Sequence, residues 1–287
     1  MAPKTKKSFD MPSEICEFEE IAILNDKSLE PQIRETHWFS LYIAAILAFL
    51  GCIQLGLYFS SVWPYLQEID QTITEKFLGF VFAAYSFGDL LSSPIFGYWS
   101  KKIAKIKPLI YIGFLSMFFG NIIYISAGIM PFKQRYFILF ARFFTGFGFS
   151  YVSLLRAYAV SVSIPSDRSK AIAYITGGIA LGATTGPALQ LIFTPLGRVG
   201  IRIIGDLHFN IYTGPAILAC FINLAAYFLI YFCFTEKNIG VIDKNTAKEK
   251  GVDLPPYCRI AVAVCYLTCF CLMFVVINLE TYVFKTL

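Results

Sequence analysis

Seven stretches of this sequence are long and apolar enough to cross a membrane. A helix needs about 20 mostly apolar residues to span the hydrocarbon core of a bilayer, and a window of that length finds seven matches here. The predicted spans are Trp38–Val62, Phe77–Trp99, Pro108–Met130, Tyr136–Ala159, Ala171–Phe193, Tyr212–Phe234 and Ile260–Leu279. The pattern therefore predicts an all-α membrane protein with a bundle of six helices and a seventh transmembrane helix.

The polar stretches between these runs divide the chain into four parts. Residues 1–37 are polar and lack the apolar core of a signal peptide, so we expect a disordered cytosolic tail. Residues 38–235 hold the six-span bundle, residues 236–259 form a charged central loop, and residues 260–287 hold the seventh span with a short tail.

Composition supports the membrane assignment and excludes several classes of protein. The chain is 57% hydrophobic and 15% charged, whereas soluble domains are about 45–50% apolar and about 25% charged. This excludes an ordinary soluble enzyme and a nucleic-acid-binding domain. No nucleophile–base pair or metal-ligand cluster appears, and Cys265 with Cys269 lacks further ligands. We therefore expect no enzyme activity and no cofactor.

Basic residues predict the orientation of the chain. Cytosolic loops of membrane proteins carry an excess of lysine and arginine. With a cytosolic N-terminus, sixteen basic residues fall on the cytosolic side and six on the opposite side. The N-terminus is therefore predicted to lie in the cytosol.

Few charged residues lie inside the predicted spans, and each is a functional candidate because burying charge in a bilayer is costly. Arg142 in the fourth span has three open interpretations: contact with a solute, control of a gate, or a structural role. Asp89 lies about 9 Å farther along its own span at about 1.5 Å per residue, so no direct salt bridge with Arg142 is expected. Gln54 and Gln190 are further polar candidates for a transport path.

Small residues are the second feature of the spans. Glycines spaced by four allow close contact between helices, and a proline inside a helix favours a kink. Plain helix packing is the favoured interpretation of the glycines alone. We assign a helix-shaping role to Gly97, Gly146, Gly148, Gly182, Gly186 and Pro187.

Four elements occur in order along the chain: a basic loop after Gly97, Arg142 followed by Gly146 and Gly148, the Gly182-x-x-x-Gly186-Pro187 segment, and the central loop. Together they resemble the major facilitator superfamily. The segments Trp63-Pro64-Tyr65-Leu66, Ser93-Pro94-Ile95-Phe96-Gly97 and Asn210-Ile211-Tyr212-Thr213 further resemble its lysosomal branch, that of domain-containing protein eight (ceroid-lipofuscinosis type seven).

The resemblance implies a secondary carrier built from two six-span bundles joined by a cytosolic loop, about twelve spans in all. This chain holds one bundle and one further span, so it lacks most of the second half. Two departures change the expected mechanism. Lys101 stands where the superfamily usually has an aspartate, and the first span offers Gln54 but no acidic residue. Proton coupling through an acid in that span is therefore not expected.

Three functions remain open at this point. The first is a transporter of a small solute, an anion if Arg142 contacts it, in the endolysosomal membrane. The second is a lysosomal chloride channel, and the third is a non-transporting form that assembles with a second copy or a full-length relative. Glu19–Leu24 and Tyr257–Ile260 resemble endolysosomal sorting signals, with the plasma membrane as the alternative location.

Overall fold

The computed structural model describes residues 35–69, 72–103, 105–128, 134–197, 200–204, 207–236 and 259–286. The predicted tail before residue 35 and the central loop at residues 237–258 lie outside the described residues. The chain divides into two compact units, one comprising residues 32–241 and the other comprising the remainder.

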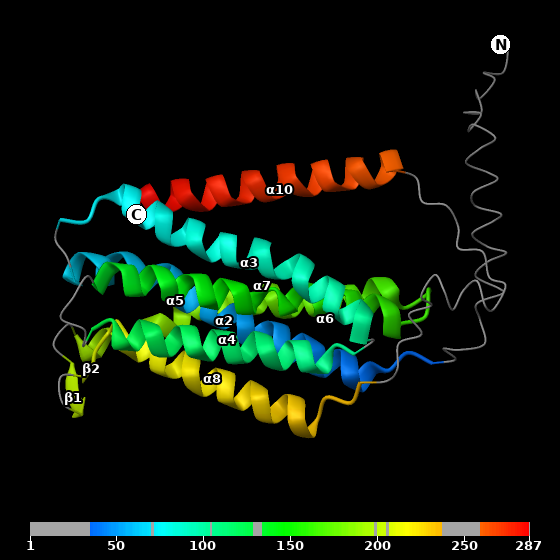
Figure 1. Cartoon of the computed structure of the whole chain (residues 1–287), viewed down its shortest axis with the longest axis horizontal. Helices are drawn as coiled ribbons and strands as arrows, with labels where there is room; N and C mark the ends of the chain where they lie inside the picture. Colours follow the sequence, from blue (N-terminus) through cyan, green and yellow to red (C-terminus); the bar gives the residue numbers. More distant parts are fainter. Residues whose placement is uncertain are drawn as a thin grey trace, which may run out of the picture. The chain divides into compact units, whose positions relative to one another are not determined.

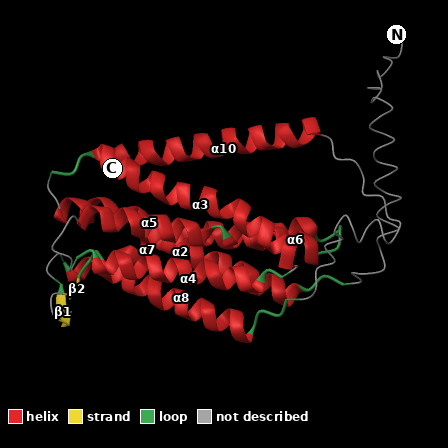
Figure 2. Ribbon diagram, in the orientation of Figure 1, coloured by secondary structure: helices red, strands yellow, loops and turns green. Residues whose placement is uncertain are grey.

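The first unit is a helical bundle (Figures 1 and 2). Its helices are α2 (Trp38–Ile69), α3 (Glu75–Ile103), α4 (Lys107–Ser126), α5 (Gln134–Phe149), α6 (Tyr151–Val162), α7 (Arg168–Ile192) and α8 (Thr213–Phe232). Six stretches are long and apolar enough to cross a membrane, because α5 and α6 together make one of them, Gln134–Val162. The predicted six-helix bundle is confirmed.

Two details of the bundle were not predicted. The fourth span is divided at Ser150, shortly after Gly146 and Gly148, residues with low helix propensity. A 3-10 turn, η1 (Thr194–Leu196), and an antiparallel hairpin of β1 (Ile201–Ile204) and β2 (Leu207–Phe209) lie between α7 and α8. The apolar and polar pattern alone gave no signal for so short a hairpin.

Helix α2 is the most buried of the six spans: 67% of its most apolar stretch is buried, against 17% for α3 and 22% for α7. It packs along α7, where glycines bring the two backbones together. A Cβ on Gly186 would lie 2.6 Å from the Cα of Gly56, and one on Gly182 would lie 2.5 Å from the carbonyl oxygen of Phe49. Only glycine allows this approach.

Side-chain hydrogen bonds link the loops at one end of the bundle, which we call the basic end. The basic residues at this end are Lys101, Lys102, Lys105, Lys107, Arg168 and Lys170. The carboxylate of Glu236, after α8, accepts hydrogen bonds from the backbone N–H groups of Ile106 and Lys107 at the start of α4. The hydroxyl of Thr36 donates to Asp167, 2.9 Å away, before α7. These contacts tie the chain ends of the bundle to its loops.

The second unit contributes one described helix, α10 (Arg259–Thr286). Its described part includes the apolar stretch Ile260–Leu272. The predicted seventh span thus corresponds to an apolar helix that follows the central loop.

Candidate functional site

Arg142 is buried inside the bundle. Arg142 lies on α5 and is 5% exposed. Its guanidinium carbon lies 4.1 Å from the centroid of the Tyr58 ring on α2. The face of an aromatic ring carries negative charge density and attracts a cation. The Tyr58 ring therefore helps to compensate the buried charge of Arg142 through a direct cation–π contact.

In the described part of the chain, three tyrosines act electrostatically on Arg142: Tyr124, Tyr58 and Tyr85. Within the described residues, no aspartate or glutamate forms an ion pair with it. Asp89 is half-buried on α3, where its side-chain and backbone oxygens accept hydrogen bonds from Ser93. Tyr85 lies within electrostatic range of both Asp89 and Arg142. Asp89 and Arg142 therefore both lie near Tyr85 but do not form an ion pair with each other.

A buried chain of hydrogen bonds leads away from the Tyr58 ring. The Tyr58 hydroxyl donates to Asn121 Oδ1 at 2.6 Å, and Asn121 Nδ2 donates to Gln54 Oε1 at 3.1 Å. Gln54 Nε2 in turn donates to Asn223 Oδ1 at 2.6 Å. The chain links α2, α4 and α8, and its amides are at most 2% exposed. We call these four residues with Arg142 the central polar site.

The central polar site and its surroundings contain polar atoms without hydrogen-bond partners. Asn223 Nδ2 and the hydroxyls of Tyr85 and Tyr65 are buried and make no hydrogen bond to the described residues. A buried donor without an acceptor costs about 1–3 kcal/mol, and most buried polar groups in proteins are paired. A bound solute or water with acceptor atoms would satisfy these donors.

Sequence reasoning selected Arg142 and Gln54, which the structure joins through Tyr58 and Asn121. It did not select Tyr58, Asn121 or Asn223. The signal was present for the asparagines, since each is an amide inside an otherwise apolar span, as Gln54 is. The role of Tyr58 depends on ring orientation, which the sequence pattern does not reveal.

Gln190, the fourth predicted path residue, lies apart from this cluster. It is buried near the end of α7, where its Nε2 donates to the carbonyl of Ile211 at 3.1 Å. Its Oε1 has no partner within the described residues. No contact that the structure shows connects Gln190 with Arg142, so tertiary structure separates two polar residues that the sequence grouped together.

The predicted helix-shaping residues lie in close helix contacts, with the exception of Gly97. A Cβ on Gly146 would collide with the backbone carbonyl of Tyr85, and one on Gly148 would collide with that of Gly113. Gly182, Gly186 and Pro187 pack against α2, with the Pro187 ring against Gly56. Gly97 differs, because a Cβ there would meet nothing within 4 Å.

Comparison with known proteins identifies the family. The model of the Major Facilitator Superfamily matches residues 38–287. This chain belongs to the major facilitator superfamily. It is 31% identical over 214 residues to major facilitator superfamily domain-containing protein 8 of Xenopus laevis, an alignment that covers 74% of this chain and 42% of that relative.

A more distant similarity connects the chain to a bacterial member of the superfamily. It is 26% identical over 162 residues to multidrug resistance protein 2 of Bacillus subtilis (strain 168), covering 56% of this chain and 37% of that protein. The chain therefore spans less than half the length of these curated relatives.

Proposed function

We propose that this chain provides the N-terminal bundle of a secondary carrier that moves a small anionic solute across an endosomal or lysosomal membrane. Membership of the major facilitator superfamily supports transport. The excess of basic residues at one end of the bundle supports a cytosolic N-terminus. The compartment rests on the resemblance to the lysosomal branch and on the sorting-like segment Glu19–Leu24.

The observation that carries the proposal is the environment of Arg142. The guanidinium is buried against tyrosine rings, with no carboxylate paired to it in the described part of the chain. Such a cation retains positive potential in a medium of low dielectric constant, and charged residues inside membranes commonly mark solute pathways. An anion beside Arg142 would supply the missing counter-charge and give the unpaired Tyr85 hydroxyl an acceptor.

The close glycine contacts are also consistent with a bundle that moves as one unit. Gly146 packs on the backbone of α3, and Gly186 packs on the backbone of α2. Carriers of this type alternate access by moving one bundle against another around a central site. We propose that Gly146, Gly148, Gly182, Gly186 and Pro187 keep the helices around the site closely packed during this motion.

A thermal-shift experiment tests the anion site. The purified chain in detergent is heated with chloride, phosphate, citrate or glutamate as probe. A ligand at one hundred times its Kd adds about 2.7 kcal/mol to stability, which corresponds to a rise in Tm of about 5 °C or more for a chain of this size. We expect at least one of these anions to stabilise the protein and Arg142→Gln to abolish the shift.

Arg156 offers the matched control, because it lies on α6 in the same span and is exposed. Arg156→Gln should keep the full anion-dependent shift. An equal loss of the shift in both variants would indicate non-specific charge effects and contradict a solute role for Arg142.

An anion channel is the second candidate. The first span has no acidic residue opposite Arg142, so no carboxylate there couples flux to protons. A continuous pore with Arg142 as its cation would favour anions. Chloride flux through vesicles containing the chain separates the two candidates: a channel gives flux that does not saturate with chloride concentration, and a carrier gives flux that does.

Assembly is the third candidate. The exposed apolar faces of α3 and α7 suit contact with another bundle, from a second copy or a longer relative. The chain itself would then supply one half of a transport path, or would interfere with a complete transporter.

A further inference from the structure

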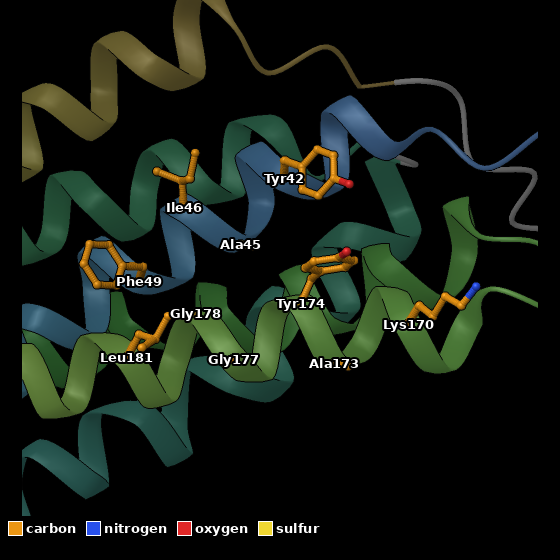
Figure 3. Close-up of a pocket in the computed structure, with 10 residues that line it drawn as sticks. All are labelled: Tyr42, Ala45, Ile46, Phe49, Lys170, Ala173, Tyr174, Gly177, Gly178 and Leu181. Carbon is orange, nitrogen blue, oxygen red and sulfur yellow. The ribbon is translucent and has the colours of Figure 1, made fainter.

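A second concave feature lies away from Arg142, between α2 and α7. It is a groove of about 730 Å³, within the range of about 300–1,000 Å³ that ligand-binding clefts occupy. Its walls are apolar and aromatic, and Lys170 is the single charged residue among those that line it. Figure 3 shows Tyr42 of α2 opposite Tyr174 of α7, with Lys170 toward one end and Phe49 and Leu181 toward the other.

Glycines make the groove possible. Gly178 packs directly on Ala45, where a Cβ would lie 2.5 Å from the carbonyl oxygen. Gly177, the next residue, also lines the groove, yet a Cβ there would meet nothing within 4 Å. The pair thus holds α7 against α2 and leaves open space above the contact.

The lining of the groove changes from polar at Lys170 to apolar at Leu181. Lys170 lies in the first turn of α7 at the basic end of the bundle, and Leu181 lies eleven positions later. At about 1.5 Å per residue these positions are about 16 Å apart, close to half of the hydrocarbon core of about 30 Å. The groove therefore extends from the membrane interface to about the middle of the bilayer.

The aromatic side chains mark the interface level. Trp38, Tyr42 and Tyr174 form a cluster in which the Tyr42 and Tyr174 ring centroids are 5.3 Å apart and those of Trp38 and Tyr174 are 5.9 Å apart. Tryptophan and tyrosine are enriched where acyl chains meet headgroups. Below them, Ile46, Phe49 and Leu181 provide apolar contacts only.

From this gradient we propose that the groove holds one anionic phospholipid of the cytosolic leaflet, with its phosphate at Lys170 and an acyl chain along Gly177 toward Leu181. The order of a cation, aromatic rings and aliphatic side chains matches that of a phosphate, glycerol backbone and acyl chain. The cytosolic leaflet carries anionic lipids, and basic residues at the interface attract them. This site is separate from the central polar site; it rests on the proposed cytosolic N-terminus and does not depend on the proposed solute.

Native mass spectrometry of the full chain tests the proposal. The chain is released from nanodiscs with equal amounts of phosphatidylserine and phosphatidylcholine, and the lipid retained by each variant is counted. We expect wild type to retain one phosphatidylserine with at least a fivefold preference over phosphatidylcholine. Gly177→Leu should fill the groove and reduce retention of both lipids about tenfold, whereas Lys170→Gln should remove only the preference.

Matched controls come from another part of the same bundle. Gly97 on α3, like Gly177, has open space around an added Cβ, and Lys101 is an exposed lysine at the same end as Lys170. Gly97→Leu and Lys101→Gln should therefore retain phosphatidylserine as wild type does. Equal retention in wild type and Gly177→Leu would overturn the proposal.

Two further outcomes are considered: a Gly177→Leu protein that does not fold, and a groove that binds a protein partner. If Gly177→Leu does not fold, the test rests on Lys170→Gln, because this substitution changes no buried contact. An unchanged preference of Lys170→Gln for phosphatidylserine would overturn the proposal. If Gly177→Leu leaves lipid retention unchanged but dissociates a protein complex, the groove is a protein interface and the lipid proposal is again overturned.

Discussion

At the scale of single residues, the structure assigns a structural role to Tyr58 that the sequence did not indicate. Its ring lies under the buried guanidinium of Arg142, and its hydroxyl begins the hydrogen-bond chain through Asn121. One side chain therefore compensates a buried charge and satisfies a buried amide. Both tasks depend on orientation in three dimensions.

Because Tyr58 has both roles, we predict that Tyr58→Leu lowers stability more than Tyr58→Phe does. Tyr58→Phe keeps the ring but leaves Asn121 without its donor, which should cost about 1–3 kcal/mol in the free energy of unfolding. Tyr58→Leu also removes the ring that contacts the buried Arg142 guanidinium, which should cost about 3–5 kcal/mol. Melting curves in detergent, followed by tryptophan fluorescence, measure both losses.

Tyr231 serves as the control for Tyr58, because it is 66% exposed on α8. Its replacement by phenylalanine or leucine should change stability by less than about 0.5 kcal/mol. A Tyr58→Leu protein as stable as Tyr58→Phe would show that the ring does not compensate Arg142.

At the scale of helices, the contact of α2 with α7 depends on glycines whose spacing was visible in the sequence. The sequence placed Gly182 and Gly186 on one face but did not identify the partner helix. The structure supplies that partner through Gly56 and Phe49 of α2. It also distinguishes Gly97, which the sequence grouped with the others and which makes no close contact through an added Cβ.

Alanine substitutions should therefore give opposite results at two glycines. Gly186→Ala places a Cβ 2.6 Å from the Gly56 Cα, so α2 and α7 must separate at a cost of about 1–3 kcal/mol. Gly97→Ala meets nothing and should be neutral or stabilise α3 by up to about 1 kcal/mol through helix propensity. Thermal unfolding of the two variants beside wild type measures the difference, and similar melting temperatures would refute the packing argument.

Considered as a whole, the six-span bundle exposes apolar side chains on most of its helices, and α3 and α7 are its least buried spans. Thr176, Ala180, Thr184 and Ala188 are spaced by four along α7, and all are exposed. Small residues at this spacing are typical of helix contacts in membranes. The superfamily pairs two bundles around one site, and this chain covers 42% of the length of its Xenopus relative.

We therefore predict that the chain assembles with another bundle in the membrane. The native complex should have a mass well above the 32.3 kDa of this chain, measured by light scattering after extraction in mild detergent. Ala180→Trp should reduce the assembled fraction, because the added ring prevents close helix approach. Ala225→Trp, on the exposed face of α8, should not; a monomer that transports anions by itself would contradict the prediction.

The amino-acid sequence was sufficient to predict the class of fold and the number of membrane-spanning stretches in the bundle. Spans of about 20 apolar residues are required by the thickness of the bilayer, so length and hydropathy were sufficient to place helices that begin near Trp38 and end near Phe232. It also identified Arg142 and Gln54, since polar side chains inside apolar spans are few and visible as exceptions.

Which of these polar residues meet depends on the packing of the helices. Arg142 and Gln54 are joined through Tyr58 and Asn121, while Gln190 lies elsewhere and Asp89 does not pair with Arg142. The physical reason is that periodicity places a residue on a face of its own helix but does not specify the neighbouring helix or the rotation of that face toward it. Those are set by backbone contacts at glycines such as Gly146 and Gly186, which involve pairs of residues far apart in the chain.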